Sequence, residues 1–311
     1  VGLILGAGIY VLIGEAAGLA GDSVWVAFVL GSIVALFAGL SYAELSSIFP
    51  KAAAEYVFIK KAFKNNFFAF IIGWLTAITS MITASTVALG FGGYFSEFFN
   101  IPIIISAIAL IGILSIINFI GIRESSWTNT IFTVLEVIGL IIIISIGFTI
   151  SEPEPVNYFE SPTGFAGVII AFVLIFFAFI GFEDMANIAE EVRNPKKTIP
   201  RAIILSVMIS GIIYVLVSLA VVRVISWEDL SLSAAPLADV AEKGLGAQGH
   251  VIFSAIALFA ITNTVLITLV AGSRMIYGMA REKLFPDIFT KINSKTKTPW
   301  VAVVVIMLIS I

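Results

Sequence analysis

Long apolar runs separated by short polar connections make up most of the chain. A helix needs about 20 apolar residues to cross a bilayer, and seven internal runs reach that length: 24–46, 67–95, 101–119, 125–149, 164–189, 201–225 and 250–278. The alternating pattern of a membrane-spanning strand is missing from the sequence. The pattern therefore predicts an all-α polytopic membrane protein.

Two further apolar runs stand at the ends of the chain. The first, VGLILGAGIYVLIG, starts at Val1, and the last starts near Val301 and continues to Ile311. We number these end runs as helices 1 and 9, and the runs between them as helices 2 to 8. Since both end runs are short for a bilayer span, we expect a fragment that is truncated at both ends.

The composition agrees with a membrane protein and narrows the chemistry. Hydrophobic residues make up 60% of the chain and charged residues 12%, against about 25% charged residues in soluble domains. With no cysteine and one histidine, the sequence offers no disulfide, no thiolate metal site and no Ser–His or Cys–His set for nucleophilic catalysis. We therefore expect neither an enzyme nor a metal site. His250 has no partner ligand at a suitable sequence spacing, so we expect it to be solvated.

Positive charge alternates between successive connections. The connections after helices 2, 4, 6 and 8 hold 15 of the 17 Lys and Arg residues, and the opposite connections hold the other two. Positive residues mark the cytoplasmic side of a membrane protein. We therefore predict a multi-pass protein of the cell membrane whose connections after helices 2, 4, 6 and 8 are cytoplasmic. This places Lys60, Lys196 and Lys295 inside, and Glu154 and Lys243 outside.

One charged residue interrupts an otherwise apolar stretch of helix 5. Glu136 lies in the run TVLEVIGLIIIISIGF, Thr133 to Phe148, and its spacing places it on one helix face with Asn129, Thr133 and Gly139. A charged residue at the centre of a span costs about 2.5–3.5 kcal/mol on insertion scales. We therefore expect Glu136 to face the protein interior, where low-dielectric surroundings favour a protonated carboxyl group.

Two runs carry the signs of an interrupted helix. The glycines of GLILGAGIYVLIGEAAG in helix 1 allow non-helical backbone, or, at Gly2 and Gly6, a small-residue face for close helix packing. Helix 6 contains Gly181, Glu183 and Asp184 inside its apolar run. We expect regular hydrogen bonding to be lost around Gly6–Ile9 and around Ala178–Gly181. Interrupted helices at matching positions of two halves point to a transporter site, where helix amino ends suit an anion and exposed carbonyls suit a cation.

Several motifs in chain order resemble a known family. They are LGAGIYVLIGEAAGLAG, LSYAELSSIFPKAAAEYVFIKKAF, GW at Gly73–Trp74, NFIGIRESSWTNTIFTV, FFAFIGFEDMANIAEEVRNPKKTIPRAI and SRMIYGMAREKLFP. Together they resemble the amino acid–polyamine–organocation (APC) transporters, and within that superfamily the permeases similar to cationic amino acid transporters. The resemblance covers essentially the whole chain. The block from helix 6 to helix 7 and the block at the end of helix 8 are its most specific parts.

This resemblance implies a fold and a division of the chain. The fold is the leucine-transporter-like five-plus-five inverted repeat, truncated at both ends. Residues 1–149 are then the first repeat, with helices 1 to 5, and residues 150–163 are an external loop. Residues 164–311 hold helices 6 to 8 of the second repeat and the start of helix 9.

The resemblance also implies an α-amino acid site between helices 1 and 6. By position, the amides of Gly6, Ala7 and Gly8 bind the substrate carboxylate. Phe177 stands where the family has an aromatic gate over the substrate, although without the family ordinary lipid or core packing is the preferred interpretation of this side chain. The carbonyl groups that bind the substrate amine are those of Leu3, Ile4, Phe177, Ala178 and Ile180.

Two acidic residues are the candidates for ion coupling. In proton-dependent relatives a lysine holds the place of Glu136, so this chain reverses the charge. Glu136 is then a proton carrier, a cation ligand together with Thr262 and Asn263 of helix 8, or a structural glutamate. Glu183 falls on an acidic position next to the substrate site, where it either changes protonation during transport or steadies the helix break. The expected coupling ion is a proton or sodium, with no other cofactor.

The sequence thus predicts a secondary active amino acid transporter that is proton-coupled and works by alternating access around helices 1 and 6. Two alternatives stay open. One is a transporter or exchanger of polyamines or other organic amines with the same fold, and the other is a non-transporting membrane sensor or structural subunit. The expected partners are a small amino acid and the lipid bilayer, and nothing indicates nucleic acid. The sequence sets neither the amino acid that is selected nor the oligomeric state.

Overall fold

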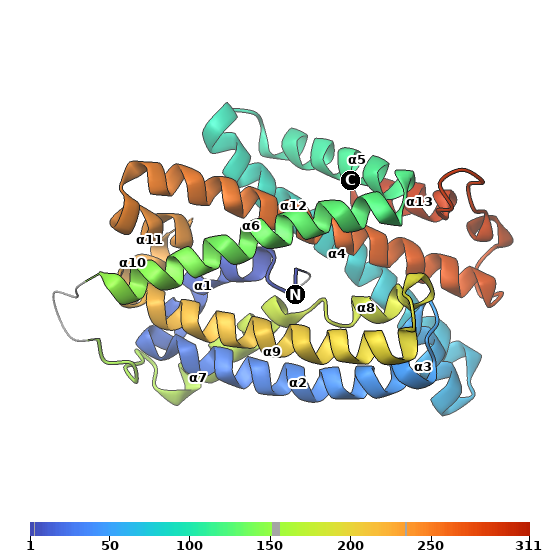
Figure 1. The fold of residues 1–311 in the computed structure, drawn as a ribbon, viewed down its shortest axis with the longest axis horizontal. Coiled ribbons are helices and arrows are strands. Elements are labelled where there is room, and N and C mark those ends of the chain that lie inside the picture. The colour runs from blue at the N-terminus through green and yellow to red at the C-terminus, as the bar shows by residue number, and fades with distance from the viewer. Residues whose placement is uncertain (3, 151–155, 234) are drawn as a thin grey trace. The chain divides into compact units, whose positions relative to one another are not determined.

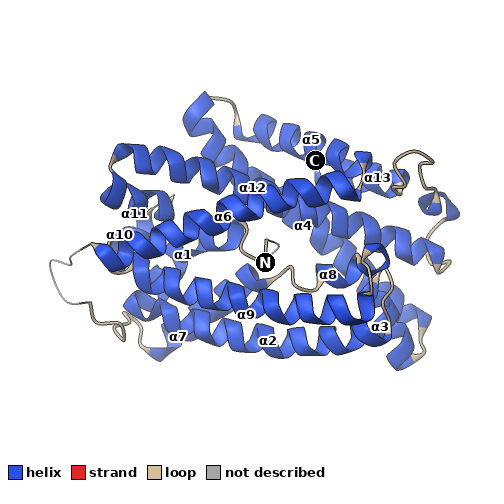
Figure 2. Ribbon diagram, in the orientation of Figure 1, coloured by secondary structure: helices blue, strands red, loops and turns tan. Residues whose placement is uncertain are grey.

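A computed structural model describes residues 1–2, 4–150, 156–233 and 235–311, and every regular element in these ranges is a helix (Figures 1 and 2). The longer helices are α1 (Ala7–Ala20), α2 (Val24–Ile48), α4 (Asn66–Phe99), α5 (Ile103–Ile120), α6 (Ile122–Thr149), α7 (Phe165–Phe179), α9 (Pro195–Val221), α12 (Ala247–Arg281) and α13 (Trp300–Ser310). The shorter ones are η1 (Gly21–Ser23), α3 (Ala54–Phe63), α8 (Asp184–Asn187), η2 (Ala189–Glu191), α10 (Trp227–Leu232), α11 (Pro236–Leu245) and η3 (Asp287–Thr290).

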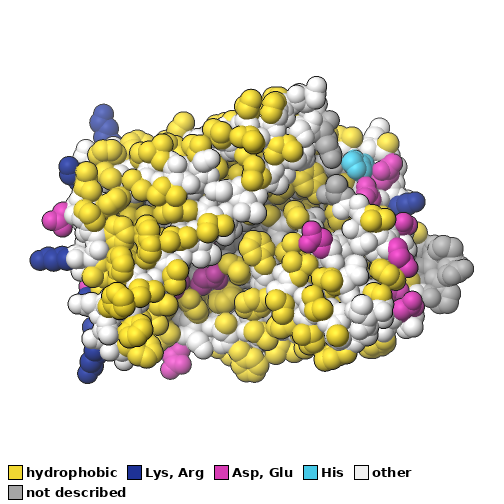
Figure 3. Space-filling view, turned by 180° about the vertical axis from the view of Figure 1, so that it is seen from behind, with side chains coloured by type: hydrophobic (Ala, Val, Ile, Leu, Met, Phe, Trp, Pro, Cys, Tyr) yellow, Lys and Arg dark blue, Asp and Glu magenta, His cyan; other side chains and the backbone are white. Residues whose placement is uncertain are grey.

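The long helices follow the apolar runs of the sequence to within a few residues at most ends. In the described part of the chain, 7 helical stretches are long and apolar enough to cross a membrane. Large apolar side chains also lie on the surface, such as Phe37, Ile104 and Val173, which are 69%, 65% and 67% exposed. Hydrophobic side chains cover much of the face that Figure 3 shows. Such a surface suits lipid rather than water, and the predicted all-α polytopic fold class is confirmed.

The sequence pattern missed the short helices of the connections. Ser226 is the N-cap of helix α10, and its Oγ accepts a 3.2 Å hydrogen bond from the Asp229 N–H. Helix α11 begins with Pro236 at a position where a missing N–H has no cost. These helices are much shorter than a bilayer span, so a search for apolar runs does not find them.

The described chain folds as two compact units. The first unit is 1–38, 132–182 and 205–260, and the second unit is 39–131, 183–204 and 261–311. Helices α2, α6, α9 and α12 each contribute one part to each unit. The predicted repeats, 1–149 and 164–311, are two consecutive stretches of sequence, whereas each compact unit combines several separate segments. The division into repeats therefore stays a prediction.

In the first unit, α1 packs against α7, α10 and α11. Glycines on α1 make the contact with α10 close. A Cβ atom on Gly14 would lie 2.5 Å from the Leu230 carbonyl oxygen, and one on Gly18 would lie 2.7 Å from the Ser231 Cβ. These two glycines therefore allow the close packing of α1 against α10.

In the second unit, α4 packs against α3 and α5, and α13 packs against α4 and α5. Two glycines bring α3 and its entry close to α4 and α12. A Cβ atom on Gly73 of α4 would lie 3.3 Å from the Tyr56 Cβ and 2.7 Å from the Met279 Sδ. One on Gly278 of α12 would lie 2.6 Å from the Ala53 Cβ. The amino end of α3 is thus held closely against long apolar helices.

Candidate site at the helix interruptions

Helix α1 begins inside the glycine-rich run. Before Ala7, Ile4 lies in a turn and Leu5 and Gly6 lie in a bend, and the N–H groups of Ile4 and Leu5 both bond to the Val1 carbonyl, at 3.0 and 2.9 Å. The expected loss of regular hydrogen bonding around Gly6–Ile9 falls at this helix start, where the first four N–H groups have no acceptor within the helix, although Ala7–Ile9 already form the first turn of α1. The non-helical backbone lies at residues 4–6, directly before α1. Leu3, a predicted carbonyl ligand, lies outside the described residues.

Helix α7 ends where the sequence predicted an interruption. Phe179 is its last residue, and the Ile180 N–H bonds to the Phe177 carbonyl at 3.1 Å, as in a closing turn. Gly181 follows with a φ angle of 119°, which glycine adopts without strain. Helical structure resumes at Asp184. Ala178 itself is still helical, so the interruption is Ile180–Glu183, slightly later than predicted.

The two interruptions meet at one side chain, Tyr214 of α9. Its hydroxyl group lies 3.0 Å from the Ala178 carbonyl oxygen and also within hydrogen-bonding distance of the Ile4 carbonyl oxygen. Because both carbonyl oxygens approach the same atom, they converge on one point in the first unit. The fully buried Tyr214 ring packs edge-on against Phe179, with 5.1 Å between ring centroids. Sequence reasoning missed Tyr214, which reads there as one more aromatic residue in an apolar run.

The first turn of α1 also touches the last turn of α7 directly. A Cβ atom on Gly8 would lie 2.6 Å from both the Cα and the Cβ of Ala178. Only glycine fits at this distance. Since the first four N–H groups of a helix have no acceptor within that helix, the positive end of α1 lies against the carbonyl end of α7. The structure therefore brings Ile4, Gly8 and Ala178 together.

The remaining predicted ligands have less defined places. Gly6 immediately precedes α1 and, like Ala7, is buried. Phe177 and Ile180 are 40% and 39% exposed in the first unit. Their exposure is compatible both with an open site and with contact to lipid, so the gate assigned to Phe177 stays a prediction.

Glu136 lies inside the first unit, fully buried on α6. The Tyr10 hydroxyl donates a hydrogen bond to its backbone carbonyl, at 3.3 Å. The neighbours on the same helix face also point inward: the space beside Gly2 is filled by Thr133, and a Cβ atom on Gly139 would lie 3.3 Å from the Tyr10 hydroxyl. The predicted inward face of helix 5 is confirmed for these residues, which lie against α1 and the segment before it.

The other coupling candidates belong to the second unit. Asn263 of α12 is fully buried and Thr262 is partly buried. Glu183 directly precedes α8 and is partly buried, as is Asp184. The cation site that joins Thr262 and Asn263 to Glu136 combines residues of both units and stays a prediction.

Glu183 and Asp184 have an acidic neighbour that the sequence did not single out. Glu55 of α3 is 7% exposed. The electrostatic neighbours of this carboxyl group include Glu183 and Asp184. In the sequence, Glu55 lies in a connection with several lysines and therefore reads as a solvated surface residue.

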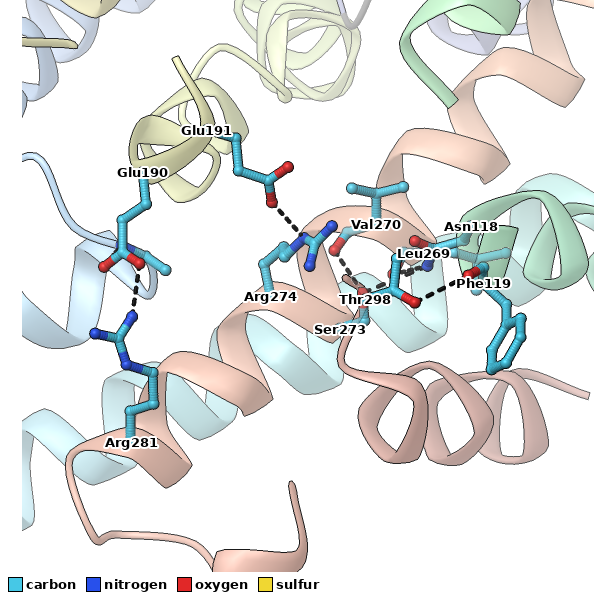
Figure 4. A network of polar contacts seen from close by, with 11 residues as sticks. Asn118, Phe119, Glu190, Glu191, Leu269, Val270, Ser273, Arg274, Arg281 and Thr298 are labelled. Carbon is cyan, nitrogen blue, oxygen red and sulfur yellow. Dashed lines mark hydrogen bonds and ion pairs between the residues drawn. The ribbon is translucent and has the colours of Figure 1, made fainter. Parts of the chain in front are cut away.

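Two ion pairs join η2 to α12 in the second unit (Figure 4). The Glu191 carboxylate lies 3.1 Å from Arg274 Nε, and Glu190 lies 2.6 Å from Arg281 Nη1. The first pair is the more buried, since the Arg274 side chain is 6% exposed and that of Arg281 is 49% exposed. Sequence reasoning counted Arg274 with the charges that flank helix 8, but the structure buries it within α12.

Neutral hydrogen bonds continue this network along α12. The Asn118 amide donates to the Leu269 carbonyl and to the Ser273 hydroxyl, at 3.4 Å each, and the Thr298 hydroxyl donates to the Phe119 carbonyl at 2.9 Å. Figure 4 shows these groups on the other side of α12 from Glu191. A cavity of about 270 Å³ adjoins the charged side and is lined by Glu190, Glu191, Arg274 and Lys297 among other residues.

One expectation about His250 needs correction. The sequence offered no partner at ligand spacing, yet α11 brings Asp239 to within 3.4 Å of His250 Nε2. Glu242 lies on the same helix, and one ligand-type atom from each of the three residues lies within 4.8 Å of the others. The partner was missed because it comes from a separate helix. The close contact between His250 Nε2 and the Asp239 carboxylate accounts for this group without a metal ion.

These features define a class of protein. Helical spans, an apolar surface, and a helix start that meets an interrupted helix at buried polar groups are typical of secondary transporters. The fold is similar to that of Mhp1, a nucleobase–cation symport-1 family transporter in a closed conformation with bromovinylhydantoin bound. The TM-score is 0.57 at 15% identity, over 99% of this chain and 69% of that one. The chain thus has a leucine-transporter-like fold.

The chain belongs to the amino acid permease family, which it matches over residues 1–311. It is 32% identical to the branched-chain amino acid permease BcaP of Bacillus subtilis, over 97% of this chain and 69% of that protein. It is 29% identical to cationic amino acid transporter 4 of Mus musculus, over 98% of this chain and 52% of that protein. The chain therefore spans about half the length of the mouse relative. The predicted resemblance to APC transporters is confirmed, and this family membership makes the chain a transporter rather than an enzyme, as predicted.

Proposed function

We propose that the full-length protein is a secondary active transporter that binds an α-amino acid where α1 begins and α7 ends. The observation that carries this proposal is the convergence of the Ile4 and Ala178 carbonyl oxygens beside the first turn of α1. An α-amino acid carries a carboxylate and an ammonium group on one carbon atom. The N–H groups at a helix start suit the carboxylate, and clustered carbonyl oxygens suit the ammonium group.

The Tyr214 hydroxyl marks the position of the ammonium group. A hydroxyl group has one proton to donate, so it satisfies two carbonyl oxygens only in part. Each carbonyl oxygen has a second lone pair, and an ammonium group has three protons. An incoming ammonium group therefore completes the hydrogen bonding of Ile4 and Ala178 without displacing Tyr214.

Glu136 is the proton carrier in this proposal. It is fully buried on α6, and its backbone carbonyl bonds to Tyr10, which belongs to α1. Gain or loss of its proton changes the charge beside the helix that binds substrate. A protonated Glu136 keeps α1 and α6 together, and release of the proton allows them to separate. Glu183 is a second titratable group at the end of the α7 interruption.

Uptake assays with the full-length protein in liposomes test the proposal. We expect uptake of at least one of the twenty radiolabelled amino acids, and faster uptake when the pH is lower on the side from which substrate enters. Sodium is varied separately. A response to sodium instead of pH would exclude the proton carrier but keep the amino acid site.

Competition by amines distinguishes an amino acid transporter from the first alternative, a transporter of polyamines or other organic amines. Each transported amino acid is compared with the amine that lacks its carboxylate. If the helix-start amides bind the carboxylate, we expect the amine to compete at least 10-fold less well. Equal competition favours an organic amine transporter. A protein that binds an amino acid but moves none across the membrane favours the sensor.

A further inference from the structure

Glu55 stands out among the titratable groups because it is buried without a partner charge. It lies in the first turn of α3 and is 7% exposed. Neither oxygen of its carboxylate makes a well-formed hydrogen bond. None of the ion pairs among the described residues involves Glu55, and Lys60 on the same helix is bound to Glu282 at 2.9 Å.

The groups that face Glu55 come from three neighbouring parts of the second unit. Tyr42 of α2 and Asn187 of α8 are polar and uncharged, whereas Glu183 and Asp184, at the start of α8, are acidic. Three carboxyl groups thus lie together, with no basic side chain among the described groups that face Glu55. An ionised carboxylate in such surroundings loses hydration and is repelled by its neighbours, so the protonated form is favoured.

The pKa of the Glu55 carboxyl group follows this geometry. Burial is the main reason that its pKa is raised to about 7, and the charge of Glu183 raises it as well. Hydrogen-bonding groups around the carboxyl group, including Asn187 and Tyr42, lower the pKa by less. Glu55 therefore titrates near neutral pH.

A structural contact connects Glu55 to the chain beyond the α7 interruption. The N–H of Ala54, the residue before Glu55, donates a 2.8 Å hydrogen bond to Asn187 Oδ1. Asn187 is the last residue of α8 and is 1% exposed. The contact between α3 and α8 also includes the apolar side chains of Phe58 and Ala186. A negative charge on Glu55 repels the acidic start of α8, whereas the hydrogen bond from Ala54 to Asn187 holds the end of α8 against α3.

We propose that Glu55 is a proton-binding site that controls the contact between α3 and α8. With the proton bound, α3 and α8 stay together; when the proton leaves, repulsion from Glu183 and Asp184 loosens them. The control of transport rests on the proposed function, because α8 follows the interruption assigned to substrate. The predicted orientation places this site on the cytoplasmic side, where it senses internal pH.

Thermal unfolding of the purified full-length protein tests the proton site without any transport. The folded protein keeps a proton that the unfolded chain releases near pH 4.5. The stability that this proton contributes is therefore fully present below that pH and is lost as the pH rises toward about 7. One proton changes the unfolding equilibrium constant by up to about tenfold per pH unit. We expect Glu55→Gln to lose this dependence. The matched control, Glu44→Gln at an exposed glutamate of α2, should keep it.

Infrared difference spectra give a direct signal. A protonated carboxyl band should disappear between pH 5 and pH 8 in the native protein and be absent from Glu55→Gln. If Glu55→Gln does not fold, Glu55→Asp should move the band and its midpoint rather than remove them. A native pH dependence and an unchanged band in Glu55→Gln would overturn the proposal.

Uptake into liposomes tests the regulatory part. With internal pH varied and external pH fixed, native uptake should change with a midpoint near pH 7, and Glu55→Gln should not respond. A retained response in Glu55→Gln excludes the regulation. If no variant takes up amino acid, the proposed function fails, while the unfolding and infrared results still decide whether Glu55 binds a proton.

Discussion

The hydroxyl group of Tyr214 lies 3.0 Å from the backbone carbonyl oxygen of Ala178, in the last turn of α7. The same hydroxyl reaches the Ile4 carbonyl, in the segment before α1. One side chain on α9 therefore links the start of α1 to the end of α7 in the first unit. Its loss should affect both stability and substrate binding.

Tyr214→Phe tests this link. The substitution removes the hydroxyl and leaves the ring in place, so the expected cost is about 1 kcal/mol, the net value of a typical hydrogen bond. We expect a lower melting temperature and weaker amino acid binding, measured by thermal unfolding and calorimetry. Tyr158→Phe is the control, since only the backbone of Tyr158 makes a described hydrogen bond. Unchanged binding in Tyr214→Phe would remove the hydroxyl from the site.

Gly8→Ala tests the close contact between α1 and α7. The added Cβ meets the Ala178 backbone at 2.6 Å, and overpacking of this kind costs about 1–3 kcal/mol. The control is Gly112→Ala on α5, where no atom lies within 4 Å of the new Cβ and a helical Gly→Ala change stabilises by about 0.5–1 kcal/mol. The denaturation midpoint should therefore fall for Gly8→Ala and rise for Gly112→Ala, relative to the native protein. Equal shifts would mean that α1 and α7 do not touch at Gly8.

Glu136→Gln separates proton coupling from binding. Glutamine keeps the size of the buried side chain but cannot release a proton near neutral pH. We expect substrate affinity to stay within about threefold, a change of less than 1 kcal/mol, while stimulation of uptake by a pH gradient is lost. Glu228→Gln, at an exposed residue of α10, should behave as the native protein. If Glu136→Gln keeps its response to pH and shows no dependence on sodium, Glu136 is structural.

Glu191→Gln tests the buried ion pair on α12. It leaves the Arg274 guanidinium buried without its counter-charge, which costs about 3 kcal/mol or more in fully buried pairs. Because the Glu191 side chain is 30% exposed, solvent screens the pair and we expect a loss nearer 2 kcal/mol. Glu190→Gln breaks the more exposed pair with Arg281 and should cost less than 1 kcal/mol. Chemical denaturation compares the two, and a reversed order would contradict the assigned burial.

Single cysteines test the predicted orientation. The native chain has no cysteine, so each introduced thiol is the only one in this sequence. An impermeant thiol reagent applied to intact cells should label Lys243→Cys and spare Lys196→Cys. Labelling at 196 from outside would reverse the orientation. Glu154, also predicted to be external, lies outside the described residues.

The sequence predicted the fold class well because the bilayer requires long apolar helices. It also located the interruption at Gly181, since glycine next to Glu183 and Asp184 is unusual within a span. It pointed to the start of α1 at Gly6–Ile9, but it did not show that Ala7–Ile9 are already helical, because glycine permits non-helical backbone without requiring it. Here Gly8 is needed for close packing against Ala178 instead.

The polar partners were harder to predict. Tyr214 lies 36 residues from Ala178 in the sequence and 210 from Ile4, so no local pattern connects them. Glu55 and Arg274 appeared as flanking charges, because composition does not reveal which charges are covered by other helices. Such pairings depend on tertiary contacts, which the periodicity of a single helix does not contain.

The loop before α7 is attached to the start of α2 through its own backbone. The Trp25 ring N–H donates to the Tyr158 carbonyl at 2.7 Å, and the Ser23 hydroxyl donates to the Glu160 carbonyl at 2.7 Å. Both acceptors are main-chain atoms that every residue type carries. A substitution at 158 or 160 therefore keeps the acceptor of each hydrogen bond, whereas a substitution at 23 or 25 can remove its donor. Among related permeases, this loop can diverge in sequence and still keep its path.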